Sequence, residues 1–357
     1  MTSILGMGFA TPDASLPQGR IAEIACGLAG SSSIRRTSAL RTLYARSGVS
    51  ARGSVLATSD GRLPFFEDRT HAPTTGERVG TYTHHALGLA LPACLDALND
   101  ASVNPAAVTH LVTASCTGFE APGVDLSLIE SLGLTPDVRR THVGFMGCHA
   151  AINAIAAARA FAEAQADAVV LVCCVELCSL HFGPARGTST AADALFADGA
   201  AACVLSADAD ASGVDLVSTR STLIPGTAAD MSWRIGDQGF EMRLSARVPD
   251  VLAQAVPPWI DAWLAELGLK RRDIAGWAIH PGGPRIVERL AGTLGTDRRS
   301  VDASLSVLDT HGNMSSPTVL FVAQRLMDEG IQGPIVAMAF GPGLAGEAML
   351  LDTKHKF

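Results

Sequence analysis

The chain carries two copies of one pattern, separated by a constant distance along the sequence. Segment 94–115 has the composition of a helix, a polar turn and a buried strand, and segment 259–280 repeats that order, with Asp96 corresponding to Asp261. The offset is 261 − 96 = 165 residues. Self-similarity at a fixed offset restricts the possible folds more than composition does.

Two further pairs of segments lie at the same offset. Segments 147–161 and 312–326 each begin with glycine and a polar residue and continue as a long apolar helix, and 312 − 147 = 165. Segments 168–174 and 333–339 are apolar runs suited to strands buried on both faces. The pattern predicts an α/β fold of two similar halves stacked about a pseudo-twofold axis.

The boundary between the halves is expected in the polar stretch 206–213, which gives an N-terminal unit of residues 1–210 and a C-terminal unit of residues 211–357. No low-complexity linker separates the units, so they are expected to share an extensive interface. The first half carries an extra stretch at residues 181–197, and insertions at strand ends tend to build functional sites.

Composition excludes several classes of protein. The 357 residues are 48% hydrophobic without an apolar run of membrane-spanning length, which predicts a globular chain with no membrane span. The net charge of −8 argues against a general nucleic-acid or anionic-membrane binder. The N-terminus lacks the pattern of a secretory signal, so a cytoplasmic location is expected.

The eight cysteines are scattered without paired CxxC spacing and are expected to be reduced thiols. A metal site would have to use the group Cys173, Cys174, Cys178 and His181. Neighbouring side chains of a strand point to opposite faces and no second ligand pair follows, so no metal is expected.

The two repeat-related helices begin with different polar groups. Cys148 follows Gly147 in the first half, and Asn313 follows Gly312 in the second. A thiol at a helix N-terminus faces unpaired N–H groups and the positive end of the helix dipole, which lower its pKa. This predicts Cys148 as a nucleophile; the alternative is a structural cysteine within a core helix.

His280 follows an apolar strand and enters a loop rich in proline and glycine. The carboxyl end of a strand is where α/β proteins place functional groups. Asn313 offers an amide donor, although asparagine is also favoured as a helix N-cap. Together, the imidazole and the amide would form an oxyanion hole for a thioester carbonyl or an enolate.

The sequence around these three residues resembles the type III polyketide synthases, the chalcone-synthase-like branch of the thiolase superfamily. The resemblance covers nearly the whole chain and rests on GFMGCHAA around Cys148, IHPGGPRI around His280, GNMSSPTVLF around Asn313 and FGPGL at 340–344. It implies a thiolase fold, in which duplicated α/β halves form a five-layer αβαβα architecture, and a homodimer.

The resemblance also implies an acyltransferase that uses coenzyme A thioesters without a cofactor. Cys148 would accept an acyl-CoA starter, and His280 and Asn313 would bind malonyl-CoA during decarboxylative Claisen condensation. Initiating β-ketoacyl carrier-protein synthases share this residue set and are the alternative. Their histidine motif differs, however, from the Pro281-Gly282-Gly283-Pro284 run found here.

Under the resemblance, Phe196 is an aromatic gatekeeper of the substrate cavity. Met242 occupies the place of a second gatekeeper phenylalanine, with Phe240 as the alternative. The other cavity residues that it implies are Cys116, Glu176, Cys178, His181, Ser315, Phe340 and Gly341.

Glu176 and Ser315 resemble members of a hydrogen-bond network that favours aldol over lactone ring closure in some relatives. Cys116 stands where a threonine is common, and S–H is a poor donor. The sequence therefore leaves open whether the product is an alkylpyrone, an alkylresorcinol or a related phenolic. Met242 and the small Ala121 of loop 118–123 favour a long or fatty acyl starter.

No Asp or Glu occurs between Ala25 and Ser59, whereas five arginines do: Arg35, Arg36, Arg41, Arg46 and Arg52. Guanidinium groups suit phosphate. The resemblance implies that basic residues here hold the coenzyme's phosphates. The coenzyme A site is therefore expected to comprise Arg46, Arg52, Arg285, Gly282 and Gly283, the alternative for each arginine being a solvated surface position.

Overall fold

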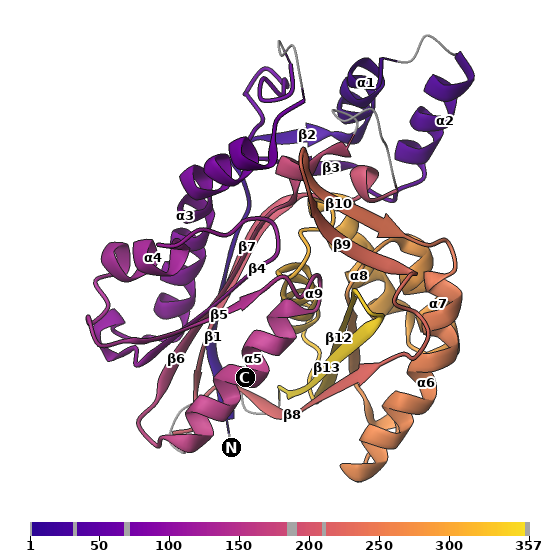
Figure 1. The fold of residues 1–357 in the computed structure, drawn as a ribbon. Coiled ribbons are helices and arrows are strands. Elements are labelled where there is room, and N and C mark those ends of the chain that lie inside the picture. Colours follow the sequence, from indigo (N-terminus) through magenta and orange to yellow (C-terminus); the bar gives the residue numbers. More distant parts are fainter. Residues whose placement is uncertain (1, 31–33, 68–71, 184–190, 209–211, 354–357) are drawn as a thin grey trace.

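The computed structural model describes residues 2–30, 34–67, 72–183, 191–208 and 212–353 (Figure 1). Its main sheet has nine strands in the order β11-β12-β13-β8-β1-β7-β6-β4-β5. These strands are β1 (Thr2–Ala10), β4 (His110–Ser115), β5 (Arg139–Gly144), β6 (Val169–Leu177), β7 (Asp198–Ser206), β8 (Val214–Leu223), β11 (Gly276–Ile279), β12 (Pro334–Gly341) and β13 (Ala345–Asp352).

The predicted duplication is confirmed by the strand order. Outward from the centre, the first half reads β1, β7, β6, β4 and the second reads β8, β13, β12, β11. The corresponding pairs have the same sense: β7–β6 and β13–β12 are antiparallel, whereas β6–β4 and β12–β11 are parallel. β6 and β12 start at residues 169 and 334, which are 334 − 169 = 165 positions apart. An antiparallel pairing of β1 with β8 joins the halves.

Helices cover both faces of each half and give the expected five layers (Figure 1). α3 packs on the outer face of the first half, α6 and α7 pack on that of the second, and α5 and α9 lie between the halves. The helices are α1 (Gln18–Leu28), α2 (Ile34–Ala45), α3 (Thr75–Asp100), α4 (Val124–Leu132), α5 (Ala150–Ala164), α6 (Val248–Glu266), α7 (Pro284–Leu294), α8 (Arg298–His311) and α9 (Thr318–Asp328).

Continuous apolar strands are needed because each strand packs against two helical layers. In β6, Leu171 and Cys173 belong to the core beneath α3, whereas Val172 and Cys174 belong to the core around α5 and α9. Alternation of side chains along the strand produces this division. Alanines on α5 allow the central layer to be thin.

A hairpin of the second half crosses to the first. Its strands, β9 (Met231–Gly236) and β10 (Gly239–Leu244), pair with each other outside the main sheet. The Trp233 indole donates a hydrogen bond to the Cys116 carbonyl at 2.7 Å, and the Phe240 amide donates to Nδ1 of His181 at 2.9 Å. The hairpin therefore closes over the space between the halves.

A small N-terminal subdomain flanks the hairpin at the top of the molecule (Figure 1). It comprises α1, α2 and the two-stranded pair of β2 (Ser15–Pro17) and β3 (Ala51–Gly53). None of the helices in the described ranges combines the length and the apolar character required to cross a membrane.

Glycines on β1 allow close contact with α3. We therefore expect one added methyl group at such a glycine to lower the stability of the fold. A Cβ at Gly8 would lie 2.2 Å from the Ala93 carbonyl oxygen, so we expect Gly8→Ala to lower the free energy of unfolding. Overpacking of this kind costs about 1–3 kcal/mol. Urea unfolding measures the change.

Gly88→Ala is the matched control, because a Cβ there meets no atom within 4 Å. Glycine within a helix costs about 0.5–1 kcal/mol relative to alanine, so this variant should be slightly more stable than the parent. Equal stability of Gly8→Ala and the parent would contradict the packing argument.

Candidate active site

Four adjoining cavities lead from the surface to the interior of the first half, and successive cavities share lining residues. The surface cavity, here called the mouth, is lined by Arg46, Gly282, Gly283 and Arg285, among others. The central cavity contains Cys148, His280 and Asn313. The mouth and the central cavity share Leu195, Leu244, Gly282 and Ile286.

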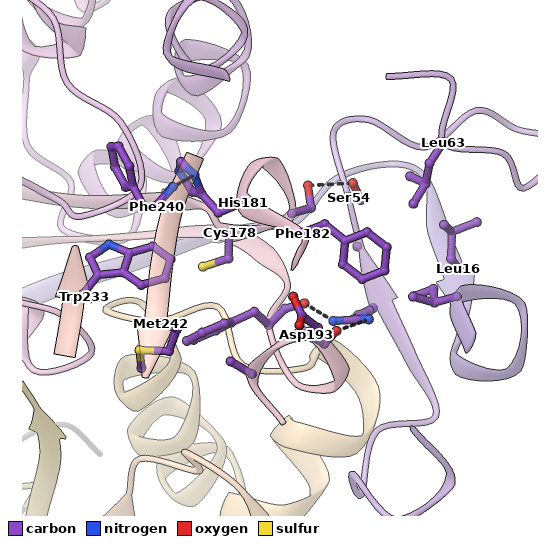
Figure 2. A pocket seen from close by; sticks show the side chains of 16 residues that line it. Leu16, Ser54, Leu63, Cys178, His181, Phe182, Asp193, Trp233, Phe240 and Met242 are labelled. Carbon is purple, nitrogen blue, oxygen red and sulfur yellow. Dashed lines mark hydrogen bonds between the residues drawn. The ribbon is translucent and has the colours of Figure 1, made fainter. Parts of the chain in front are cut away.

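Two further cavities continue inward. A side cavity lies against Cys116, Cys148 and Ser315. A deep cavity extends to Leu16 and Leu63, with Trp233 and Phe240 at its other end (Figure 2). The side and deep cavities share Cys178, Phe196, Trp233 and Met242.

Cys148 lies between the strand β5 and the helix α5. Gly147 before it has φ +84°, and a Cβ there would lie 2.6 Å from Cδ of Pro342, so this turn requires glycine. The Cys148 side chain is buried, and the Ser315 hydroxyl lies 3.6 Å from its sulfur. The local chain thus presents the thiol to the central and side cavities.

The expectation of a lowered Cys148 pKa is wrong for this structure. Burial raises the pKa of the Cys148 thiol to about 12, against the opposing effect of hydrogen bonds from Ser315 and Asn313. The helix α5 begins at Ala150, two residues after Cys148, so the favourable effect of its N-terminus on the thiolate is smaller than the effect of burial on the pKa. Burial therefore disfavours the thiolate form of Cys148 in the absence of a ligand.

His280 directly follows β11 and is almost completely buried. Burial lowers the pKa of its imidazole to about 3, with a smaller contribution from His149. Neither ring nitrogen has a hydrogen-bond partner among the residues that the structure describes. A buried, neutral imidazole with both nitrogens unpaired is suited to bind a polar group of a ligand.

Asn313 is held in place by its own backbone and by Ser315. Its amide oxygen accepts a hydrogen bond from the Ser315 N–H at 2.8 Å, which leaves the NH₂ group to interact with Cys148. The alternative of an N-cap is wrong, because the N-cap of α9 is Pro317. Asn313 is therefore available as a donor within the central cavity.

Arg52 does not belong to a coenzyme A site, which corrects the sequence prediction. It is buried, and its guanidinium donates hydrogen bonds to the carbonyls of Phe196 and, at 2.7 Å, Asp193. Both contacts hold the backbone around Phe196 in place. By contrast, Arg46 and Arg285 are exposed and lie at the mouth with Gly282 and Gly283.

The two gatekeeper candidates have different positions. Phe196 lines the central, side and deep cavities, and so does Met242. Phe240 is buried against His181, with ring centroids 4.1 Å apart, and lines only the deep cavity. Met242 rather than Phe240 therefore forms the wall beside Cys148.

Glu176 lies behind the wall of the side cavity and is completely buried. Its carboxylate accepts hydrogen bonds from Ser316 and Thr117, both at 2.7 Å, and from the Cys116 N–H at 2.9 Å. Burial raises the pKa of Glu176, and these hydrogen bonds oppose that effect. The Cys116 sulfur lies 3.4 Å from the Ser315 hydroxyl, so a polar chain connects Glu176 to Cys148.

The remaining predicted cavity residues are distributed differently. Phe340 lines the central cavity, Cys178 the side and deep cavities, and His181 the deep cavity. Gly341 packs against His149 instead, where a Cβ would lie 2.5 Å from the ring. Part of the predicted insertion, residues 184–190, lies outside the described residues.

Within the described part of the chain, no group of three or more His, Cys, Asp or Glu side chains is arranged to hold a metal ion.

Comparison with known protein families assigns the chain. Residues 1–209 match the model of the N-terminal domain of chalcone and stilbene synthases, and residues 215–354 match the model of their C-terminal domain. The chain belongs to the chalcone and stilbene synthase family. It is a type III polyketide synthase, a condensing enzyme that transfers acyl groups.

Known relatives of this synthase agree in sequence and in fold. It is 33% identical over 320 residues to the alpha-pyrone synthesis polyketide synthase-like Pks18 of Mycobacterium tuberculosis, covering 87% of this chain and 81% of the relative. It also resembles the structure of PKS-I from the brown alga Ectocarpus siliculosus, with a TM-score of 0.91, 30% identity and 98% of both chains covered. The C-terminal type III domain of Steely1 from Dictyostelium gives a TM-score of 0.90 at 26% identity, covering 98% of this chain and 99% of that domain.

Sequence reasoning missed several residues of the synthase's cavities. Trp233 lines both the side and the deep cavity, and Thr117 binds Glu176. Trp233 belongs to a hairpin strand outside the duplicated pattern, so no periodicity indicated where its ring would lie. Thr117 follows the predicted Cys116 directly, and that proximity was the available signal.

The corrected position of Arg52 predicts a change in stability rather than in substrate affinity. Arg52→Gln removes buried charge-assisted hydrogen bonds, each worth about 1.5–3 kcal/mol. We expect a lower free energy of unfolding in urea and an unchanged KM for malonyl-CoA in the folded fraction.

Arg46→Gln provides the comparison, since Arg46 is exposed at the mouth. We expect this variant to raise KM with no change in stability. A stable Arg52→Gln protein with an increased KM would restore Arg52 to the coenzyme A site.

Proposed function

We propose that this type III polyketide synthase loads a long acyl group from coenzyme A onto Cys148, extends it with malonyl-CoA and releases an alkylpyrone. The observation that carries the proposal is the convergence of Cys148, His280 and Asn313 on one buried cavity. That cavity adjoins a mouth with exposed arginines and, through the side cavity, an interior space whose walls combine apolar side chains with polar ones such as His181 and Asp193.

In the loading step, the Cys148 sulfur attacks the thioester carbonyl of the starter. The Cys148 proton must leave during the attack, and His280, whose ring nitrogens are both unpaired among the described residues, lies in the same cavity to accept it. The bond between the acyl carbon and the coenzyme A sulfur breaks, and the proton passes to the departing coenzyme A thiol. Loading thus leaves no net charge in the cavity.

In the extension step, His280 and the Asn313 NH₂ donate hydrogen bonds to the carbonyl oxygen of the malonyl thioester. Loss of carbon dioxide places negative charge on this oxygen, which preorganised donors in a dry site stabilise. The enolate carbon then attacks the acyl group on Cys148, and the Cys148 sulfur leaves. Since burial raises the pKa of this thiol to about 12, it takes up one proton per extension.

We place the alkyl part of the starter in the deep cavity, whose free volume of about 40 Å³ requires side chains of its wall to move before a long chain enters. Leu16 and Ile21 of the N-terminal subdomain line it. Leu63 and Phe182 complete this apolar part of the wall (Figure 2). Burial of each methylene in such surroundings contributes about 0.8 kcal/mol. Single substitutions along this wall would therefore alter chain-length preference.

The surroundings of Glu176 favour lactone over aldol closure. Its oxygens already accept hydrogen bonds from Ser316, Thr117 and the Cys116 backbone, and the remaining link to Cys148 passes through a weakly donating thiol. Lactone formation uses an enol oxygen of the polyketide itself and requires no activated water. The alpha-pyrone synthesis in the name of the Mycobacterium relative agrees with this assignment.

The homodimer stays a prediction from the family, and the cytoplasmic location stays a prediction from the sequence. The loop 118–123 supports the homodimer, because Phe119 is 45% exposed and the nearby Met146 is 39% exposed. Two such side chains on one face are suited to burial against a second copy.

The pKa of His280 predicts a pH-independent decarboxylation step. At a pKa of about 3 the imidazole is neutral throughout the working range. Malonyl-CoA decarboxylation by a Cys148→Ala protein should therefore be constant from about pH 6 to about pH 9. Carbon dioxide release measures the rate; an inflection near pH 6.5 that disappears in His280→Gln would contradict a neutral donor.

Substitutions separate the donors from the nucleophile. His280→Gln keeps a neutral donor and should retain part of the rate, whereas His280→Ala and Asn313→Ala should each lose about a hundredfold or more. Acylation of Cys148 should remain detectable in Asn313→Ala by intact-protein mass spectrometry. Equal loss of acylation and decarboxylation would show that Asn313 has no separate role.

The proposed ring closure predicts the products. With malonyl-CoA and a series of fatty acyl-CoA starters, we expect mass spectrometry to find alkylpyrones. In Cys116→Thr a hydroxyl replaces the thiol beside Glu176, so the ratio of alkylresorcinol to alkylpyrone should rise. Cys178→Thr is the control, because Cys178 lines the same cavity and forms no hydrogen bond with Glu176 among the described residues. Resorcinols as the main product of the parent would overturn the assignment.

A further inference from the structure

Ser315 has a backbone conformation that serine rarely adopts. Its φ is +60°, in the left-handed region that favours glycine, and its side chain is almost completely buried. The residue lies between the end of α8 and the start of α9, in the same turn as Asn313. A glycine would adopt this conformation without strain, so the presence of serine indicates a use for its side chain.

The Ser315 hydroxyl contacts two sulfur atoms. It donates a hydrogen bond to the Cys148 sulfur at 3.6 Å, and it lies 3.4 Å from the Cys116 sulfur. The Cys116 thiol donates its own proton to Glu176 at 3.2 Å. Of the two sulfurs, the one that carries negative charge accepts hydrogen bonds more strongly, so the Ser315 proton points to Cys148 when the thiolate forms.

Negative charge on the Cys148 sulfur requires donors of this kind. Burial raises the pKa of Cys148, and the hydrogen bond from Ser315 opposes that effect, as does the hydrogen bond from Asn313. A buried charge is costly unless hydrogen bonds replace the lost water. The thiolate therefore depends on these polar groups of the cavity wall.

The proposed extension step divides these donors between two atoms. His280 and the Asn313 NH₂ group bind the carbonyl oxygen of the malonyl thioester while carbon dioxide leaves. The Cys148 sulfur then leaves the acyl carbon with a negative charge, at a time when Asn313 is engaged with the oxygen. The Ser315 hydroxyl is a separate donor, so the oxygen and the sulfur can be stabilised together.

We propose that Ser315 is a catalytic residue that stabilises negative charge on the Cys148 sulfur, both when this sulfur attacks the starter and when it leaves the extended chain. The hydroxyl donates a hydrogen bond and keeps its proton, and no covalent bond to Ser315 forms or breaks. The inference rests on the proposed loading of Cys148. His280 and Asn313 thus serve the oxygen, and Ser315 serves the sulfur.

The backbone of Ser315 has a different task from its side chain. The Ser315 N–H donates to the Asn313 amide oxygen at 2.8 Å and so orients the NH₂ group. Ser315→Gly keeps this N–H and fits the left-handed backbone, whereas it removes the hydroxyl. This variant therefore separates the effect of the hydroxyl from the positioning of Asn313.

The first experiment measures the reactivity of Cys148 in the full-length protein. Alkylation by iodoacetamide is followed by peptide mass spectrometry from about pH 6 to about pH 10. At neutral pH we expect Ser315→Gly to react about tenfold more slowly than the parent, because one charge-assisted hydrogen bond to the thiolate is lost. Ser315→Ala, which keeps the Cβ, should show the same loss. The free energy of unfolding of Ser315→Gly in urea should not fall, since glycine relieves the backbone strain.

Ser102→Gly is the matched control. Ser102 also has a positive φ, +53°, but it is exposed after the end of α3 and lines none of the four cavities. This substitution should leave the alkylation rate of Cys148 unchanged. Like Ser315→Gly, it should not lower the free energy of unfolding.

The second experiment distinguishes the sulfur from the oxygen. Malonyl-CoA decarboxylation is measured in Cys148→Ala and in Cys148→Ala/Ser315→Gly, and we expect equal rates because the donors to the oxygen remain. By contrast, Ser315→Gly alone should slow the acylation of Cys148 by dodecanoyl-CoA about tenfold. This pattern is the reverse of the one expected for Asn313→Ala.

Three results would overturn the proposal: alkylation of Ser315→Gly at the rate of the parent, the same loss in Ser102→Gly, or a loss of decarboxylation equal to the loss of acylation. The last result would show that Ser315 acts by orienting Asn313. Failure of dodecanoyl-CoA to acylate the parent would refute the proposed loading instead, and the alkylation rates would still decide whether Ser315 stabilises the thiolate.

Discussion

Two backbone hydrogen bonds join the halves of the molecule at the site. The Ala197 N–H donates to the Asn313 carbonyl, and the Asn313 N–H donates to the Leu195 carbonyl, both at 2.8 Å. They fix the amide of the second half beside the aromatic wall of the first, while Arg52 holds the same segment from behind. Backbone contacts of this kind tolerate little displacement, so the position of Asn313 depends on the packing of both halves.

Burial governs the chemistry of the cavity. Loss of water raises the pKa of Cys148 and lowers the pKa of His280, so each group alone is neutral. Charge then develops only during the reaction, where fixed donors can stabilise it without reorganising solvent. The same burial makes the Glu176 carboxylate depend on the hydrogen bonds that surround it.

The fold could be predicted because short sequence patterns of the first half repeat in the second. Apolar strands such as 168–174 and helices that follow a glycine recur at one offset in the sequence. The structure contains these strands and helices at the predicted positions. The placement of Cys148, His280 and Asn313 in one cavity also agrees with expectation, since each residue lies at the end of a repeated element. Their catalytic roles remain proposals.

The incorrect predictions concern residues whose environment is determined by tertiary packing. The sequence of an arginine-rich segment does not reveal which guanidinium is buried, so it predicts a phosphate contact for Arg52, whose guanidinium instead donates to backbone carbonyls. The lowered pKa expected for Cys148 depends on a helix that starts at this residue, whereas α5 starts two residues later and burial has the largest effect on the pKa. Trp233 could not be placed because its hairpin has no counterpart in the repeat.

The hairpin of β9 and β10 forms part of the cavity wall, whereas the main sheet positions Cys148, His280 and Asn313. β9 and β10 are attached to the first half by side-chain and loop contacts and take no part in the main sheet. Residues such as Trp233 and Met242 can therefore be exchanged without altering the strands that bring the nucleophile and its donors together. Diversification of products within one architecture would be expected to concentrate in this short, replaceable cover.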